Sequence, residues 1–158
     1  MKLARTIRFD ESDLNVFEHP AEPDEWAISG GFAFSNWSPE MITGKARQAF
    51  ANGWLGLDSF GRSTFVAVAQ IEPAEYEDAA AALARHFVDV YGAPDVETAL
   101  PAARDELAFM ADLCDEHAPN TLLVVERSLT EAGVKEGFRA IVPADAELEA
   151  FAVHGDAD

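Results

Sequence analysis

Residues 62–71, RSTFVAVAQI, run directly into residues 72–91, EPAEYEDAAAALARHFVDVY, and together these segments decide the fold. The first is apolar, rich in β-branched residues and free of Gly and Pro, which predicts a central strand. In the second, Pro73 fits the first turn of a helix, and the acidic residues after it suit the positive end of the helix dipole. Apolar side chains then recur at helical spacing on one face: Tyr76, Ala80, Leu83, Phe87 and Tyr91. Because neither a short strand nor a lone amphipathic helix is stable by itself, we expect this unit to form the middle of one core.

The length and composition of the chain indicate one soluble domain. A chain of 158 residues, half of them hydrophobic and a quarter charged, has the usual size and composition of a globular domain. We expect residues 1–143 to form this domain, followed by an acidic tail at 144–158 in which 145–152 suit a short helix. The one cysteine cannot form an intramolecular disulfide, and no signal peptide or membrane span is evident, so a cytoplasmic location is predicted.

The formal net charge of −18 is unevenly distributed along the chain. Residues 1–62 carry six basic and nine acidic side chains, whereas residues 63–158 carry five basic and twenty acidic ones. Such a surface repels nucleic acid and anionic lipid, so we expect neither as a partner. Solubility alone would account for the charge, and a basic protein partner is the alternative interpretation.

Three strands are expected in the first part of the chain, at 3–9, 14–17 and 25–34. Gly30-Gly31 interrupts the third and suggests a bulge or a close backbone approach. Ser38 and Pro39 then predict the start of a helix that continues to Asn52. The loop 53–61, GWLGLDSFG, carries four large apolar side chains that must fold inward or face a partner.

Helices and a hairpin are expected after residue 92. Pro101 should separate a short turn at 96–100 from a longer helix that ends near His117. The buried stripe of that helix is Ala103, Leu107, Met110 and Cys114. Two strands, 121–129 and 134–142, flank a turn with Gly133 at the position that favours positive φ. This order predicts an α+β fold: a single domain with a mainly antiparallel sheet of about six strands and three helices packed on one face.

Few side chains are spaced for metal binding or nucleophilic catalysis. The one combination with ligand spacing is His86, Asp89, Cys114 and His117. It offers a single thiol and requires two helices to pair in one register, so neither a metal nor another cofactor is expected. Acidic neighbours should raise the pKa of the Cys114 thiol, and Ser59 lacks the Gly-x-Ser-x-Gly pattern of a nucleophile elbow. No catalytic residue is therefore predicted.

Aromatic and cationic side chains gather in the N-terminal half of the chain. The candidate binding residues are Trp37, Lys45, Arg47, Trp54, Phe60 and Arg62. Tryptophan and arginine are enriched at binding hot spots, so this band is a candidate docking face in an otherwise acidic protein. The tryptophans would serve equally as core residues, and the two interpretations stay open. Thr43-Gly44-Lys45 lacks the upstream glycine of a phosphate loop, because Pro39 stands at that position.

Four stretches resemble a family of small uncharacterised alphaproteobacterial proteins, and the likeness covers nearly the whole chain. They are residues 5–10, RTIRFD; 21–30, AEPDEWAISG; 43–50, TGKARQAF; and 58–64, DSFGRST. Arg62 departs from the Trp expected there. The resemblance implies a cytoplasmic bacterial protein without an established activity, in an accessory role linked to redox metalloenzyme maturation.

The leading hypothesis is therefore a small accessory protein that acts through contacts with another protein or with a second copy of itself. The alternative is a small-molecule or anion-binding protein, or an enzyme, that uses Lys45, Arg47 and Arg62 beside the loop 53–61.

Overall fold

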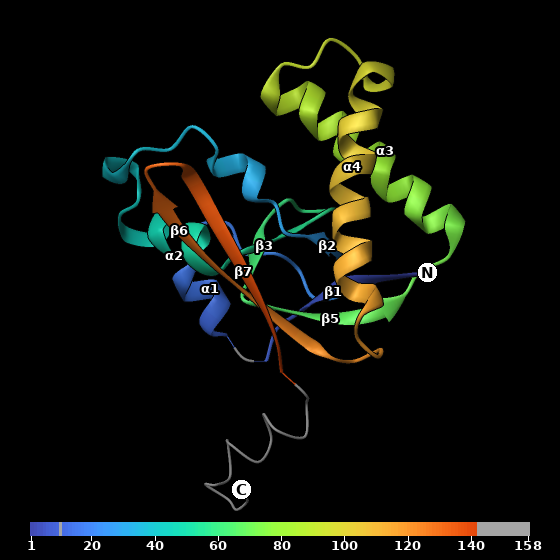
Figure 1. Cartoon of the computed structure of the whole chain (residues 1–158), viewed down its shortest axis with the longest axis horizontal. Helices are drawn as coiled ribbons and strands as arrows, with labels where there is room; N and C mark the ends of the chain where they lie inside the picture. Colours follow the sequence, from blue (N-terminus) through green and yellow to red (C-terminus); the bar gives the residue numbers. More distant parts are fainter. Residues whose placement is uncertain (10, 142–158) are drawn as a thin grey trace, which may run out of the picture.

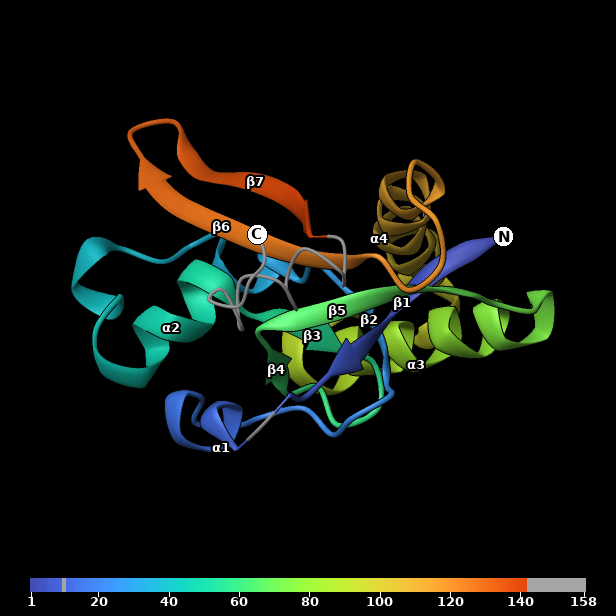
Figure 2. The ribbon, with the colours of Figure 1, turned by 90° about the horizontal axis from the view of Figure 1, so that it is seen from below.

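The computed structural model describes residues 1–9 and 11–141, which form a curled antiparallel sheet with helices packed against it (Figure 1). The strand order is β4-β3-β2-β1-β5-β6-β7, and every neighbouring pair is antiparallel. The strands are β1 (Lys2–Ile7), β2 (Trp26–Ile28), β3 (Trp54–Gly56), β4 (Arg62–Ser63), β5 (Phe65–Gln70), β6 (Leu122–Thr130) and β7 (Gly133–Ile141). The long β6–β7 hairpin lies over the short helix α2 in Figure 2, and β6 packs against that helix.

Four α-helices and two 3₁₀ turns complete the described part of the chain. They are α1 (Ser12–Val16), η1 (Gly31–Phe34), η2 (Pro39–Met41), α2 (Gly44–Asn52), α3 (Pro73–Tyr91) and α4 (Val96–Asp115). The two long helices α3 and α4 pack on each other, and α4 also lies on β1 and β2. The expected α+β class, with one domain and an antiparallel sheet, is confirmed.

The strand of the unit that decides the fold lies in the interior, and its helix buries Ala80 and Leu83 as predicted, whereas Tyr91 is 50% exposed. Strand β5 lies between β1 and β6, and Val66 and Val68 are fully buried. Helix α3 begins with a capping box, in which the Glu72 and Glu75 side chains each accept from the other's backbone N–H. Gly92 ends it in the left-handed conformation. The predicted stripe of α4 is also confirmed, because Ala103, Leu107, Met110 and Cys114 are all inaccessible to solvent.

Two predicted strands before residue 36 are wrong in type or extent. Residues 14–16 belong to α1, and Phe17 follows it in an extended conformation. In this helix the buried Asp13 carboxylate accepts a hydrogen bond from Thr64 Oγ1 at 2.8 Å. The strand expected at 25–34 stops at Ile28, because Gly30 turns the chain with a φ of 74° and η1 follows. The close backbone approach suggested for the glycine pair is confirmed, since a Cβ on Gly31 would stand 2.3 Å from Glu136 Oε2.

Three further boundaries differ from the prediction. The helix expected at 39–52 divides into η2 and α2, and part of the loop 53–61 forms β3. The strand 62–71 divides at Thr64 into β4, which pairs with β3, and β5, which pairs with β1. At this point Ser63 Oγ lies 2.9 Å from the Phe65 carbonyl oxygen and 3.1 Å from that of Ile7. Helix α4 continues through Pro101 without interruption, since this proline removes one helix bond close to the N-terminal end.

The hairpin strands and the positive φ of Gly133, at 114°, agree with the sequence. The predicted tail at 144–158 and its helix at 145–152 lie outside the described residues. Within the described residues, no helix combines the length and the apolar character that a membrane crossing requires.

Candidate functional site

Two buried arginines stand at the centre of the region where β3, β6 and η1 meet. The guanidinium carbons of Arg62 and Arg127 lie 4.7 and 5.3 Å from the centroid of the Phe34 ring. Arg62 donates from Nη1 to the Gly53 carbonyl at 3.1 Å and from Nη2 to the Gly30 carbonyl at 3.2 Å. Burial, together with the positive charge of Arg127, lowers the pKa of Arg62 to about 9.

Arg127 ties three segments together around one carboxylate. Its Nη1 donates to the carbonyls of Phe50 and Gly53 at 3.0 and 2.9 Å, and its Nη2 donates to the Ser29 carbonyl at 2.5 Å. Its Nε donates to Glu136 Oε2 at 2.7 Å, and Ser29 Oγ donates to the same oxygen at 2.6 Å. Burial lowers the pKa of Arg127, and Glu136 opposes that shift. The side chain of Glu136 is therefore held firmly while 24% of it stays exposed.

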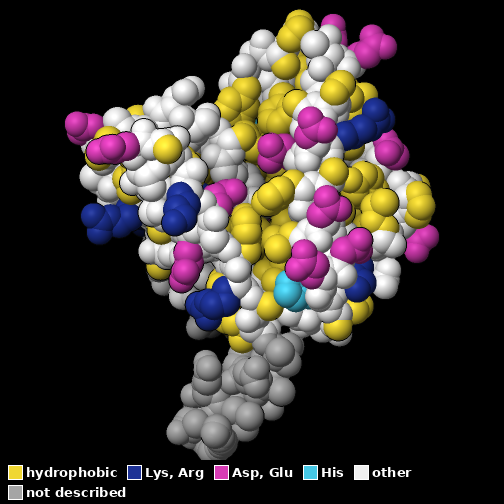
Figure 3. Space-filling view, viewed as in Figure 1, with side chains coloured by type: hydrophobic (Ala, Val, Ile, Leu, Met, Phe, Trp, Pro, Cys, Tyr) yellow, Lys and Arg dark blue, Asp and Glu magenta, His cyan; other side chains and the backbone are white. Residues whose placement is uncertain are grey.

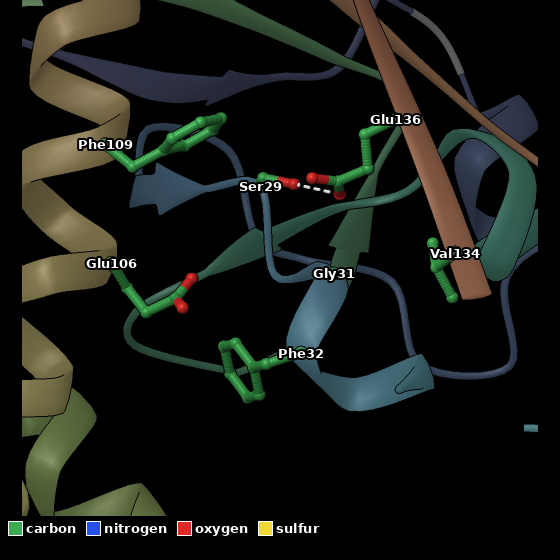
Figure 4. Close-up of a pocket in the computed structure, with 7 residues that line it drawn as sticks. All are labelled: Ser29, Gly31, Phe32, Glu106, Phe109, Val134 and Glu136. Atoms are coloured by element: carbon green, nitrogen blue, oxygen red, sulfur yellow. Dashed lines mark hydrogen bonds between the residues drawn. The ribbon is translucent and has the colours of Figure 1, made fainter. Parts of the chain in front are cut away.

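Glu136 opens into a groove between the β6–β7 hairpin and α4. The groove has a volume of about 320 Å³ and is lined by Ser29, Gly31, Phe32, Glu106, Phe109, Val134 and Glu136. Figure 3 shows apolar side chains gathered in this hollow, with acidic side chains along α4 beside it. In Figure 4, Glu106 extends from α4 and Glu136 extends from β7 to Ser29, and the rings of Phe32 and Phe109 border the groove. Phe109 is 49% exposed, and its ring lies in this concave surface.

The carboxyl group of Glu106 has no ion-pair partner within the described residues. Among residues 1–9 and 11–141, no hydrogen bond or ion pair reaches its side chain. Burial raises the pKa of Glu106, and the negative charges of Glu136 and Asp105 raise it further. The groove thus combines an apolar wall with a carboxylate whose charge the described residues leave uncompensated.

A second acidic hollow lies between α3 and the loop after β3. It has a volume of about 260 Å³ and is lined by Trp26, Leu57, Asp58, Glu75, Asp78, Ala79 and Ala82, and we call it the Trp26 hollow. Here the chain supplies its own cation. The guanidinium carbon of Arg5 lies 3.9 Å from the Trp26 ring centroid, and its Nη2 lies 3.9 Å from Glu75 Oε2.

The predicted aromatic band is not one exposed face. Trp54 is fully buried, with its ring 5.7 Å from that of Phe138, so the core interpretation holds for this tryptophan. Trp37 is half-buried and packs on Phe34 at 4.8 Å. Phe60 is half-buried and stacks on His86 at 3.9 Å.

The structure separates the three predicted cations. Lys45 and Arg47 are exposed on α2, whereas Arg62 is buried and donates to backbone carbonyls. Ligand binding through Lys45, Arg47 and Arg62 stays a prediction, as does binding through Trp37, Trp54 and Phe60.

Metal binding and nucleophilic catalysis, which the sequence did not predict, gain no support from the surroundings of Cys114 and His86. Burial, reinforced by Asp115, raises the pKa of the Cys114 thiol to about 12. His86 stacks on a phenylalanine, and burial lowers its pKa. No group of three or more metal-ligating side chains occurs within the described residues.

Sequence reasoning missed Glu106 and Glu136, and both left a weak signal. Glu136 occupies an inward position between Val134 and Phe138 at strand spacing, where an apolar residue is usual. Glu106 directly precedes Leu107 and follows the buried Ala103 by three residues, so it borders the apolar stripe of α4. Thirty residues separate the two glutamates, and only the packing of the hairpin beside α4 brings them together.

Comparison with known proteins identifies the family and nothing finer. No curated protein and no solved structure shows significant similarity to this chain. The model of a family of unknown function, DUF6505, matches residues 1–158, and the chain therefore belongs to that family.

Proposed function

We propose that the protein is a small accessory protein that binds another protein, and that the groove is its binding surface. The observation that carries the proposal is the half-exposed ring of Phe109 beside the uncompensated Glu106. Exposed aromatic side chains in a concave surface are typical anchors for a partner. The acidic lining and the net charge of −18 favour a partner segment that is basic.

The remaining parts of the proposal rest on the sequence. Its resemblance to alphaproteobacterial proteins supports a cytoplasmic bacterial protein, and it extends the proposal to a role in redox metalloenzyme maturation. The acidic surface argues against nucleic acid and membrane partners. The alternative function, which uses Lys45, Arg47 and Arg62, gains no observation in its favour.

The test is affinity capture with two matched variants. Phe109→Asp places a charge in the groove, whereas Val90→Asp places the same charge on α3 at a side chain that is 61% exposed. We expect proteins captured by the wild-type chain to be captured by Val90→Asp and lost with Phe109→Asp, under moderate salt. Circular dichroism of both variants checks that the fold is retained.

Capture of the same proteins by Phe109→Asp would remove the groove from the proposal. If the chain captures only itself, and light scattering shows a dimer that Phe109→Asp dissociates, the contact is self-association through the same surface.

A further inference from the structure

We propose that the groove is a binding site for an organic cation of the alkylguanidinium or alkylammonium class, presented by an arginine or lysine side chain of a partner. The charge would lie between Glu106 and Glu136, and the alkyl chain would lie against Phe32 and Phe109. This inference rests on the proposed function and names the chemistry that the groove recognises.

Two carboxylates line the same groove from different elements, Glu106 from α4 and Glu136 from β7 (Figure 4). Each raises the negative charge that a cation in the groove would meet. The hydrogen bonds from Ser29 and Arg127 both reach Oε2 of Glu136, which fixes the group and leaves Oε1 without a hydrogen bond from the described residues. A cation in the groove would therefore donate charge-assisted hydrogen bonds to these carboxylates.

The aromatic wall is held in place by packing. The ring of Phe32 lies 5.1 Å from that of Phe87 and 5.6 Å from that of Tyr91, both edge-on. The ring of Phe109 lies 5.6 Å from that of Phe138 on β7. An alkylguanidinium suits such a wall, because its alkyl chain packs on apolar rings and its charge is attracted by their faces.

The same chain contains a cation in this type of environment. At the Trp26 hollow, Arg5 lies over an aromatic ring and beside the carboxylate of Glu75. In the part of the chain that the structure describes, the guanidinium that bonds a groove glutamate is that of Arg127, which holds Glu136 and is inaccessible to solvent. Glu106 thus lines a groove with aromatic rings and a second carboxylate, Glu136. We assign to the ligand the place in the groove that corresponds to that of Arg5 over Trp26 and beside Glu75.

The test uses nuclear magnetic resonance titration of the full chain with three probes. The first is a capped Leu-Arg-Leu peptide, the second is the same peptide with neutral citrulline in place of arginine, and the third is n-butylguanidinium. We expect saturable shifts at the amides of Glu106, Phe109 and Glu136 with the arginine peptide. Removing one charged hydrogen bond should weaken binding about tenfold, either in the citrulline peptide or in Glu106→Gln. Asp112→Asn, an equal charge change elsewhere on α4, should bind as the wild type does.

Three results would overturn the inference: equal binding of the citrulline peptide, equal binding by Glu106→Gln, or shifts confined to the Trp26 hollow. The n-butylguanidinium arm separates the two sources of the cation. Tighter binding of the peptide supports a partner side chain. Equal binding of the free cation supports the cation site and overturns the protein partner at the groove. Conversely, partner capture that depends on Phe109 without any binding of the guanidinium probes would overturn this inference and leave the proposed function standing.

Discussion

The groove and the Trp26 hollow differ in whether a cation of the chain lies over the aromatic ring. Each places carboxylates beside an aromatic wall, and each occupies about the same volume, 320 and 260 Å³. In the Trp26 hollow, Arg5 covers the ring and pairs with Glu75. In the groove, Glu106 has no such partner among the described residues, and its pKa is raised. The difference teaches that the fold can satisfy such a site internally and leaves this one to an outside cation.

The largest expected effect comes from removing the arginine that belongs to each site. Arg127→Met removes the hydrogen bonds to Glu136 and to several buried carbonyls and leaves them without a donor. We therefore expect it to lower the free energy of unfolding by about 3–5 kcal/mol. Arg5→Met removes an exposed pair and should cost at most about 1 kcal/mol. Urea denaturation of both variants measures the difference. Equal losses would mean that the two arginines do not differ in burial as described.

The next prediction converts one site into the other. Arg5→Ala uncovers the Trp26 ring and Glu75, so n-butylguanidinium should bind in the Trp26 hollow with a dissociation constant of about 1 mM. Tryptophan fluorescence would report this binding, and the double variant Arg5→Ala, Trp26→Phe would remove the signal. The same response in the wild-type chain would show that Arg5 does not cover the Trp26 ring in solution.

A smaller effect is expected from pH. A cation binds the ionised form of Glu106, whose pKa is raised by burial, by Glu136 and by Asp105. Affinity of the groove for the arginine peptide should therefore rise as pH increases through that raised pKa, and level off above it. In Glu106→Gln the affinity should change far less over the same range. If the affinity of the wild type changed as little with pH as that of the variant, Glu106 would not bind the ligand.

The smallest effect concerns stability in the absence of ligand. Because the pKa of Glu106 is higher in the folded chain than its ordinary value of 4.5, ionisation is disfavoured by folding, and the destabilisation is present once the pH exceeds both values. Glu106→Gln should raise the free energy of unfolding slightly at pH 7, by about 0.5 kcal/mol. The gain should disappear below pH 4, where both states carry a neutral carboxyl group. Thermal melts at both pH values check this, and a loss of stability at pH 7 would contradict it.

The parts of the fold that sequence reasoning found are those with long, regular patterns. The strand before Ile71, helix α3 and the β6–β7 hairpin repeat their spacing over several turns or pairs, so local preference and burial agree. Residues 14–17 form too short a stretch for its spacing to distinguish a strand from a helix. The hydrogen-bond partner of Asp13, Thr64, lies about fifty residues further along the chain. That tertiary bond favours helix α1 and is invisible in the local sequence.

The candidate site shows the same limit. Arg62 was identified as a binding residue because cations are few in this chain, yet burial decides its role and gives it carbonyls as partners. Glu106 stood among many acidic residues, and its spacing alone did not mark it. What distinguishes Glu106 is its neighbour across the groove, which depends on where the hairpin packs.

Helix α4 forms one wall of the groove and carries Cys114 on the face turned away from solvent. With a pKa of about 12 and no accessible surface, this thiol should not react with an alkylating reagent while α4 is packed on the sheet. The chain has no second cysteine, so the rate of alkylation of the unaltered protein measures how often α4 opens locally and exposes Cys114. A ligand that occupies the groove should therefore slow the alkylation of Cys114. This readout needs no label on the surface that the ligand touches.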